Sequence, residues 1–312
     1  MTTAFILDCD TGRDDALAMW YALYEDMPLK GVVASYGNTP LNNVVINCRK
    51  VLSAFPDKKI PVFTGASAPL QHHIYIDKIV SPRQEASGNG LCNIDLPYSD
   101  GATPLAFDAL WAFIKATSSI EGAKLDYVIT GPATNFARLL DEYGADVLSQ
   151  YIGRVVMMGG KFDDLWTKLP FADFNIGADP FAVKAIMSSS IPFNIVPMNA
   201  TWPIVSPLDE IEHTKPRDAL AEQVRDIMIA HCKTFSPEPV FRFHDPAVMV
   251  ALQDNVLFKR KPLDINLTQR DDHFGQLVTA DQGHDVGVFE ISAVQIADFK
   301  ARLLRVLGLW SV

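Results

Sequence analysis

Short, fully apolar runs alternate along this 312-residue chain with segments of helical pattern. Phe5-Ile6-Leu7 precedes a helical pattern over about 14–24, and the run at 31–35 precedes another over about 43–55. Later apolar runs lie at 61–64, 127–130, 155–158 and 193–199. Strands that are apolar on both faces and alternate with helices are typical of a parallel sheet covered on both sides. We therefore predict an α/β fold with a mostly parallel central sheet, helices on both faces, and an active site at the carboxyl ends of the strands.

Two segments interrupt the alternation. Residues 65–103 are rich in proline and glycine and show little periodicity, which predicts a long loop. Residues 206–244 have a helical pattern at their centre, which predicts a helical insert. No internal repeat or linker divides the chain, and its length suits one large α/β domain. We expect a single domain over residues 1–312.

Charge and apolar patterning exclude several classes of partner. The chain has 37 acidic and 27 basic residues, a net charge of −10 and no run rich in lysine or arginine, which argues against nucleic acid. No stretch approaches the roughly 18 apolar residues of a membrane span, and no leader pattern precedes the first strand. The four cysteines form no C-x-x-C pair and are expected to be reduced. We expect a cytoplasmic protein with a small-molecule partner, without nucleic acid or membrane.

Four carboxylates follow the first apolar run within eight residues: Asp8, Asp10, Asp14 and Asp15. Helix capping accounts for Asp14 and Asp15, because a helix dipole favours negative charge in the first turn. It does not account for Asp8 and Asp10, which lie beside Gly12. Close carboxylates raise one another's pKa unless a cation lies between them. The pattern therefore favours a site for a hard divalent metal bound by oxygen atoms.

Three kinds of metal site compete. An EF-hand loop would place Asp8 and Asp10 at its first and third ligands, but Met19 would then replace the final glutamate, so we exclude it. A Mg²⁺-dependent D-x-D phosphatase would use Asp8 as nucleophile and Asp10 as acid and base. Thr130 and the glycines at later strand ends suit phosphate binding poorly. In the third kind of site, the metal activates water against a neutral substrate rich in hydroxyl groups.

Six motifs, in order along the chain, resemble those of one family. "DCDTGRDDALA" at 8–18 resembles the D-x-D-x-G-x-D-D-x-x-A signature of the calcium-dependent nucleoside hydrolases, the inosine–uridine-preferring nucleoside N-ribohydrolases. The others are "YGN" at 36–38, "TGPATNFA" at 130–137, "VVMMGG" at 155–160, "ADFNIGADP" at 172–180 and "HDP" at 244–246. This resemblance implies an open nucleoside hydrolase-like sheet, Ca²⁺ as cofactor, and a homodimer or homotetramer. It also implies hydrolysis of the N-glycosidic bond of a ribonucleoside to ribose and free base.

The resemblance also implies roles for particular residues. Ca²⁺ would be bound by Asp10, Asp15, the main-chain carbonyl of Thr130 and Asp245. A water on the metal would attack C1′ of the ribose with Asp10 as general base. The transition state would resemble a ribosyl oxocarbenium ion, as in glycoside hydrolysis. His244 would give a proton to the departing base.

Further contacts to the substrate follow from the same resemblance. Asp14 would accept a hydrogen bond from the ribose 2′-hydroxyl, and Asp245 would contact the 3′-hydroxyl. Asn38 and Asn175 would contact the ribose or the calcium shell, and Met158 would pack against the ribose. Asp8 would hold its neighbours in place from behind the site. Candidates for stacking on the base are Tyr75, Trp166, Phe241 and Phe243.

Two departures from the family pattern concern the 5′ and base sides of the substrate. Asp173 stands where the family has a glutamate that binds the 5′-hydroxyl, and the preceding family asparagine is missing. The 5′ side is therefore expected to be remodelled, with Asp164 or Lys168 as possible contributors. The loop at 65–103 lacks the family histidine, which leaves the preferred base open. A D-x-D phosphatase or a non-catalytic nucleoside-binding relative remain the alternative interpretations.

Overall fold

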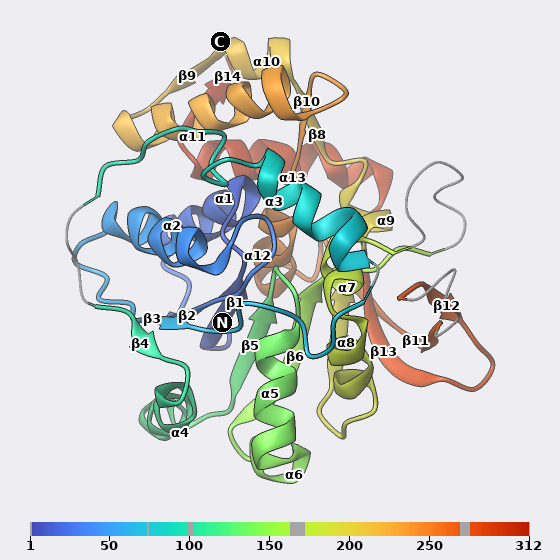
Figure 1. The fold of residues 1–312 in the computed structure, drawn as a ribbon. Coiled ribbons are helices and arrows are strands. Elements are labelled where there is room, and N and C mark those ends of the chain that lie inside the picture. The colour runs from blue at the N-terminus through green and yellow to red at the C-terminus, as the bar shows by residue number, and fades with distance from the viewer. Residues whose placement is uncertain (1, 74, 99–102, 163–171, 269–274, 312) are drawn as a thin grey trace.

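The computed structural model describes residues 2–73, 75–98, 103–162, 172–268 and 275–311 (Figure 1). A ten-stranded sheet runs through these residues. In order across the sheet, its strands are β12 (Leu277–Thr279), β11 (Lys259–Leu267), β13 (His284–Glu290), β7 (Phe193–Val196), β6 (Ile152–Met158), β5 (Leu125–Ile129), β1 (Phe5–Cys9), β2 (Leu29–Ala34), β3 (Val62–Thr64) and β4 (Leu105–Ala106).

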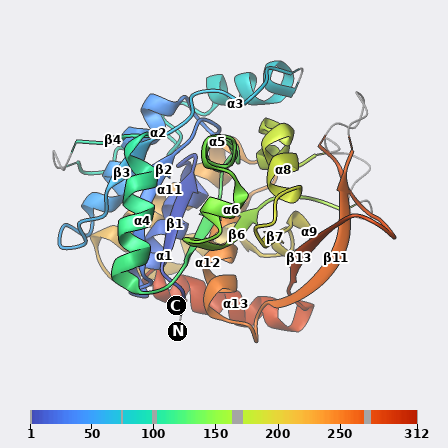
Figure 2. The ribbon, with the colours of Figure 1, turned by 90° about the horizontal axis from the view of Figure 1, so that it is seen from below.

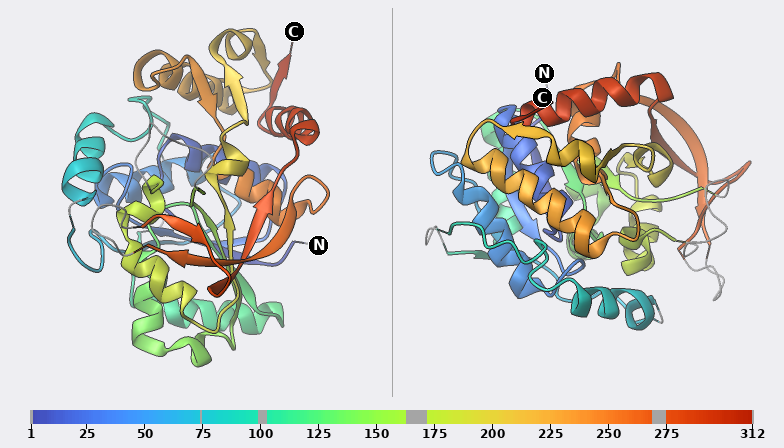
Figure 3. Two further views of the ribbon diagram at one scale, coloured as in Figure 1. Left: turned by 90° about the vertical axis from the view of Figure 1, so that its right-hand side faces the viewer. Right: turned by 90° about the horizontal axis from the view of Figure 1, so that it is seen from above.

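The strand directions confirm the predicted mostly parallel sheet. All neighbouring pairs from β13 to β4 are parallel. At the other edge, β11 pairs antiparallel with both β13 and β12, and Figures 2 and 3 show this long, curved part of the sheet. The apolar alternation did not predict this edge, because β11 is exposed along most of its length and has no apolar run. Exposure of this kind is normal for antiparallel strands and not for buried parallel ones.

Helices cover both faces of the sheet, as predicted (Figures 1 and 2). Two separate apolar clusters on the two faces form the core. One face is covered by α1 (Arg13–Tyr24), α2 (Leu41–Ser53), α11 (Ala219–Ala230), α12 (Asp245–Gln253) and α13 (Ala293–Val306). The other is covered by α4 (Ala109–Glu121), α5 (Thr134–Tyr143), α6 (Ala145–Leu148) and α8 (Pro180–Met187). Helix α1 is buried continuously from Asp15 to Leu23, because it packs against the sheet, α2 and α12.

The two segments that interrupt the alternation contain short elements of their own. Residues 65–103 include a π-helical turn, η1 (Ile76–Val80), which continues into α3 (Ser81–Ala86). Residues 206–244 include α11, α10 (Leu208–Glu212), β9 (Thr214–Pro216), η3 (His231–Phe235) and β10 (Val240–Arg242). Strand β10 pairs with β8 (Val205–Pro207), and β9 pairs with β14 (Leu309–Ser311). The remaining short helices are α7 (Phe174–Ala178) and α9 (Met198–Thr201). In the described part of the chain, no helix has the length and apolarity to cross a membrane.

The chain order of the strands reverses beside β1. From β1 the chain moves to β2 and β3 on one side, and β5 and β6 lie on the other. Open α/β sheets bind ligands at such a switch point, outside the carboxyl ends of the strands. Asp10 follows β1 and Thr130 follows β5, and the Thr130 N–H donates to the Asp8 carbonyl over 2.8 Å. The fold therefore places the first aspartates next to Thr130 at the expected edge.

Candidate active site

Asp10 is held by the turn that follows β2. The Asn38 N–H donates to Asp10 Oδ2 over 2.7 Å, and Asn38 Nδ2 donates to Asp10 Oδ1 over 3.0 Å. Gly37 makes this approach possible, because a Cβ on Gly37 would lie 1.9 Å from Asp10 Oδ2. Asn38 Oδ1 is buried and has no hydrogen-bond partner in the described residues. The turn thus fixes the Asp10 carboxylate and leaves an amide oxygen beside it without a donor.

Asp15 links the start of α1 to the end of β5. It occupies the third position of α1, where Asp15 Oδ2 accepts from the Gly12 N–H over 2.9 Å. Thr130 Oγ1 donates to Asp15 Oδ1 over 2.8 Å, and Asn38 Nδ2 reaches Oδ2 at 3.3 Å. The capping interpretation of Asp15 is therefore correct, and the same carboxylate also faces the switch point.

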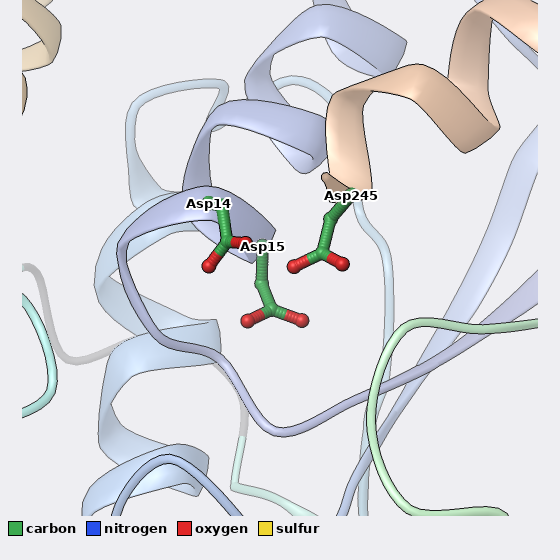
Figure 4. A group of neighbouring side chains, drawn as sticks. All are labelled: Asp14, Asp15 and Asp245. Atoms are coloured by element: carbon green, nitrogen blue, oxygen red, sulfur yellow. The ribbon is translucent and has the colours of Figure 1, made fainter. Parts of the chain in front are cut away.

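Asp14, Asp15 and Asp245 converge from two helices (Figure 4). One carboxylate oxygen from each lies within 4.8 Å of the others, which fits binding of a common cation. Asp245 is the first residue of α12, and α12 packs against α1. The structure thus brings residue 245 to the amino-terminal aspartates across a long sequence separation. We call Asp10, Asp14, Asp15 and Asp245 the carboxylate cluster.

The pKa values of the cluster reflect its crowding. Burial raises the pKa of Asp10 well above its usual value, and the negative charge of Asp15 raises it further. Burial and the charge of Asp14 raise the pKa of Asp15 to about 7. The pKa of Asp245 is also raised, by burial and by the charges of Asp14, Asp15 and Asp10. A divalent cation would remove this mutual repulsion, and the donors are all oxygen atoms, so the residues fit a hard metal.

Asp14 behaves differently from the other members of the cluster. Burial alone would raise its pKa, but the positive charge of Arg13, followed by those of His244 and Arg83, outweighs burial and lowers it. Asp14 is therefore ionised at neutral pH. An ionised carboxylate only accepts hydrogen bonds, so Asp14 suits a hydroxyl group of a ligand.

Asp8 lies beneath the cluster and is fully buried. Tyr127 Oη donates to Asp8 Oδ2 and Asn135 Nδ2 donates to Asp8 Oδ1, each over 2.9 Å. Burial raises the pKa of Asp8 to about 7, against the effect of these two hydrogen bonds. Both oxygen atoms of Asp8 are thus satisfied inside the protein, as expected of a residue that braces the site from behind.

Asn175 ties two strand ends together on the other side of Thr130. Its Nδ2 donates to the Thr130 carbonyl over 2.9 Å and to the Met158 carbonyl over 3.0 Å. Asn175, Met158 and Thr130 are all buried. The structure therefore groups these three predicted site residues, and the contact of Asn175 with the Thr130 carbonyl fixes a predicted metal ligand.

Asp173 forms contacts different from those expected of a 5′-hydroxyl ligand. Its Oδ1 accepts from the Gly160 N–H over 2.8 Å, and both oxygens accept from the Ile176 N–H over 3.3 Å. Asp173 thus caps α7 and joins it to the end of β6. Burial raises its pKa to about 6, against the effect of these backbone hydrogen bonds. The other residues suggested for the 5′ side, Asp164 and Lys168, lie outside the described residues, as does Trp166.

His244 immediately precedes Asp245 and lies beside Thr201. Its Nδ1 is 2.8 Å from Thr201 Oγ1, and its ring centroid is 6.2 Å from that of Trp202. Burial lowers the pKa of His244 to about 4, with the charge of Asp14 acting in the opposite direction. His244 is therefore neutral at pH 7. In the tautomer in which Thr201 donates to Nδ1, Nε2 carries the hydrogen and has it available for a ligand.

Comparison with known proteins places this arrangement in a family. The family model described as inosine-uridine preferring nucleoside hydrolase matches residues 5–301. The chain belongs to this nucleoside hydrolase family. It is a nucleoside hydrolase, the family is metal-dependent, and an aspartate cluster suited to a metal is present.

Curated relatives and solved structures agree with this assignment. The pyrimidine-specific ribonucleoside hydrolase RihA of Shewanella oneidensis is 30% identical over 270 residues, covering 83% of this chain and 80% of that protein. RihA of Enterobacter sp. (strain 638) is 33% identical over 205 residues, so the match spans 64% of this chain and 61% of that relative. A purine-preferring ribonucleoside hydrolase from Gardnerella vaginalis superposes with a TM-score of 0.79 at 24% identity, covering 98% of this chain and 99% of that one. At that identity the structural likeness shows the fold.

Three residues that interact electrostatically with Asp14 had no role in the sequence analysis: Arg13, Arg83 and His231. Arg13 was visible as a charged residue inside the first motif, between Gly12 and Asp14. Arg83 had no comparable signal, because it lies in α3 within an aperiodic segment. Among the aromatic candidates, Tyr75 Oη donates to the Asp173 carbonyl over 3.2 Å. Phe241 and Phe243 are buried in the core with ring centroids 5.2 Å apart.

Proposed function

We propose that this nucleoside hydrolase cleaves the N-glycosidic bond of ribonucleosides to give ribose and free base, with Ca²⁺ as its metal. The observation that carries the proposal is the convergence of Asp14, Asp15 and Asp245 at the sheet's switch point, beside Asp10. A neutral sugar diol suits such a site, because a phosphate would meet several carboxylates there. This also disfavours the D-x-D phosphatase.

Four groups would hold the metal: the carboxylates of Asp10, Asp15 and Asp245, and the main-chain carbonyl of Thr130. These are oxygen donors from three separate parts of the chain, which suits the flexible, oxygen-rich coordination of Ca²⁺. When bound, Ca²⁺ would supply positive charge that orients the ribose hydroxyls and makes water more acidic. Hydrogen bonds from Asn38, Gly12 and Thr130 hold the carboxylates of Asp10 and Asp15 in place.

The chain's own residues would carry the remaining steps. Asp10 takes a proton from the attacking water as general base. Asp14 accepts a hydrogen bond from the 2′-hydroxyl, and Asp245 accepts one from the 3′-hydroxyl. The surrounding carboxylates favour the positive charge that develops on the ribose in an oxocarbenium-like transition state.

His244 would donate a hydrogen bond to the departing base through Nε2, with Thr201 fixing the ring at Nδ1. Because its pKa is lowered to about 4, His244 is neutral, and this hydrogen bond would offset the negative charge that develops on the base. Met158 and Asn175 line the sugar side. Asp173 supports this region through its backbone hydrogen bonds and does not bind the 5′-hydroxyl directly.

A reducing-sugar assay tests the proposal. With Ca²⁺ present, we expect ribose release from at least one nucleoside in a panel of uridine, cytidine, inosine and guanosine. The panel needs both base classes, because the names of the relatives include a pyrimidine-specific and a purine-preferring enzyme. Asp10→Asn removes the proposed general base of the enzyme with almost no change in side-chain size. Asp298→Asn, on the exposed side of α13, is the matched control.

Two outcomes would contradict the proposal. Phosphate release from nucleoside 5′-monophosphates without ribose release would favour the D-x-D phosphatase. Tight nucleoside binding without turnover would favour a binding protein. The homo-oligomeric state and the cytoplasmic location that the sequence analysis expects stay predictions.

A further inference from the structure

Two neighbouring residues of helix α2 hold the backbone between β1 and α1. Thr11 is the middle member of residues 10–12, which we call the aspartate turn, and it is fully buried. Asn47 Nδ2 donates to the Thr11 carbonyl over 3.0 Å. Thr11 Oγ1 lies 3.0 Å from Cys48 Sγ, within hydrogen-bond distance for sulfur. Helix α2 therefore contacts both the main chain and the side chain of this turn.

The same amide group of Asn47 reaches a second part of the chain. Asn47 Nδ2 also donates to the Asn89 carbonyl over 2.8 Å. A side-chain amide nitrogen carries two hydrogens, so one Nδ2 can donate to both carbonyls at once. Asn89 belongs to the long loop at 65–103, whose function the sequence left open. Asn47 thus bridges this loop and the aspartate turn through a single nitrogen atom.

Residues 87–94, which we call the 87–94 segment, contain no helix or strand and are shaped by one side chain. Asn89 Oδ1 accepts from two backbone N–H groups of this segment, each over 2.9 Å. Asn89 Nδ2 donates to the Ile94 carbonyl over 3.1 Å. Local bonds of this kind fix a turn without regular secondary structure. The Asn89 side chain therefore fixes the conformation in which its own carbonyl faces Asn47.

A further hydrogen bond joins the 87–94 segment to the turn after β2. Thr39 Oγ1 donates to the Gly88 carbonyl over 3.4 Å. Thr39 directly follows Asn38, whose backbone N–H and side chain both donate to Asp10. The 87–94 segment is therefore attached to two connections that position Asp10, the aspartate turn and the turn after β2.

Burial makes the Asn47 bridge hard to replace. Asn47 is only 3% exposed, and the Thr11 carbonyl that it meets belongs to a fully buried residue. A buried carbonyl that loses its donor costs free energy, so the backbone around it tends to rearrange. Thr11 directly precedes Gly12 and follows Asp10, so a rearrangement there displaces a proposed metal ligand. Residues that hold metal ligands in place commonly change metal affinity by about 10–100-fold when mutated.

We infer that Asn47 is a positioning residue that couples the 87–94 segment to the aspartate turn, so that the conformation of this segment sets the affinity of the carboxylate cluster for Ca²⁺. The part of the inference that concerns Ca²⁺ rests on the proposed function. A change in the 87–94 segment moves the Asn89 carbonyl away from Asn47, and the Asn47 amide then no longer holds the Thr11 carbonyl in the same place. Asn47 itself touches neither metal nor substrate in this account.

A double-mutant cycle on the two asparagines tests the coupling. Calorimetry without substrate measures the Kd for Ca²⁺ in the wild type, Asn47→Ala, Asn89→Ala and the double variant. We expect Asn47→Ala to raise the Kd by about tenfold, and Asn89→Ala to raise it by about threefold or more. In the Asn47→Ala background, Asn89→Ala should have no further effect, because the link is already lost. Independent effects that multiply in the double variant would overturn the inference.

Asn194→Ala is the matched control for Asn47. Asn194 is 1% exposed, and its Nδ2 also donates to a backbone carbonyl, that of Val155, over 3.3 Å. It lies near the amino end of β7, whereas the carboxylate cluster lies at the carboxyl ends of the strands. This variant should lose stability in urea unfolding with chelator but keep the wild-type Kd. An equal rise in Kd in Asn194→Ala and Asn47→Ala would reduce Asn47 to general support of the fold and overturn the inference.

Amide hydrogen exchange in chelator tests the coupling without metal or turnover. Asn89→Ala should speed exchange in peptides covering residues 8–15 of the otherwise wild-type chain, and should not do so in the Asn47→Ala background. Asn89 is only half-buried, so this variant carries the test even if Asn47→Ala fails to fold. Unchanged exchange at 8–15 and an unchanged Kd in Asn89→Ala would overturn the inference and leave the proposed function standing.

Failure of the proposed function gives a different result. A wild type that neither binds Ca²⁺ nor releases ribose, while Asn89→Ala still speeds exchange at 8–15 only when Asn47 is present, would count against the proposed function. The same result would support the coupling between the 87–94 segment and the aspartate turn.

Discussion

Asp8 and Asp15 both belong to the connection between β1 and α1, and the pKa of each is raised to about 7. Their surroundings differ. Asp8 lies below the cluster and meets two donors, Tyr127 and Asn135, whereas Asp15 lies within 4.8 Å of Asp14 and Asp245. Burial alone accounts for the raised pKa of Asp8, while a neighbouring carboxylate adds to the effect of burial at Asp15. The comparison shows that a raised pKa alone does not distinguish a bracing residue from a candidate metal ligand, whereas crowding by other carboxylates does.

The largest expected effect comes from removal of Asp10, the proposed general base in the carboxylate cluster. We expect Asp10→Asn to lower kcat by about 10²–10⁴-fold, because an amide cannot take the proton from water. Steady-state kinetics on the best nucleoside of the panel measures the loss. Asp298→Asn should keep wild-type kcat. Full activity in Asp10→Asn would remove Asp10 from the catalytic role.

The second test displaces the Asp10 carboxylate without changing its chemistry. Gly37→Ala would place a Cβ 1.9 Å from Asp10 Oδ2, so one of the two groups must move. A displacement on this scale should lower kcat/KM by about 100-fold. Gly122→Ala is the matched control, since Gly122 has a positive φ but no atom within 4 Å of the added Cβ. Equal kinetics in both variants would show that the position of Asp10 does not matter.

The third test distinguishes Asp8 from Asp15 by the effect of Ca²⁺ on the free energy of unfolding. Ca²⁺ at 100 times its Kd should raise the free energy of unfolding of the wild type by about 2.7 kcal/mol relative to chelator. Asp15→Asn should abolish most of this gain, because a metal ligand is lost. Asp8→Asn should be less stable than the wild type but keep the gain. Urea unfolding with and without Ca²⁺ measures it, and a lost gain in Asp8→Asn alone would reverse the assignment.

The fourth test concerns a group with the opposite charge sign. Burial lowers the pKa of His231 from 6.5 to about 3. Between pH 6.5 and pH 3, His231 is therefore protonated in the unfolded chain and neutral in the folded protein. This contribution to stability is present above pH 6.5 and is lost as pH falls toward 3, amounting to about 2 kcal/mol at pH 5. Urea unfolding at pH 8 and pH 5 should show His231→Gln to be less acid-sensitive than the wild type. An unchanged pH dependence would contradict the burial of a neutral His231.

The smallest expected effect concerns Asp173. Asp173→Glu should cost about 1 kcal/mol of stability, because the longer side chain cannot keep both the α7 cap and the hydrogen bond from the Gly160 N–H. Asp173→Asn keeps an acceptor at the cap and should cost less. Thermal unfolding measures both. A gain in kcat/KM for ordinary ribonucleosides in Asp173→Glu would instead support direct contact with the 5′-hydroxyl.

The sequence predicted those parts of the molecule in which local pattern and spatial position coincide. The apolar runs at 5–7 and 127–130 are buried strands, so Asp10 and Thr130 were correctly placed at their carboxyl ends. The meeting of Asp245 with Asp15 could be anticipated only through the family resemblance, because packing of α12 on α1 is a tertiary contact. The sequence analysis gave Arg83 no role and did not predict the exposed strand β11. Neither lies in a segment with a clear hydrophobic period. The role of Asp173 depends on backbone donors, which residue types do not reveal.

Diffraction from crystals soaked in Ca²⁺, with the anomalous signal of calcium recorded, tests the central claim most directly. We expect one strong anomalous peak bounded by Asp10, Asp15 and Asp245, with oxygen ligands at about 2.3–2.6 Å that include the Thr130 carbonyl. A peak elsewhere, or carboxylates that keep their positions with no peak between them at saturating Ca²⁺, would contradict it.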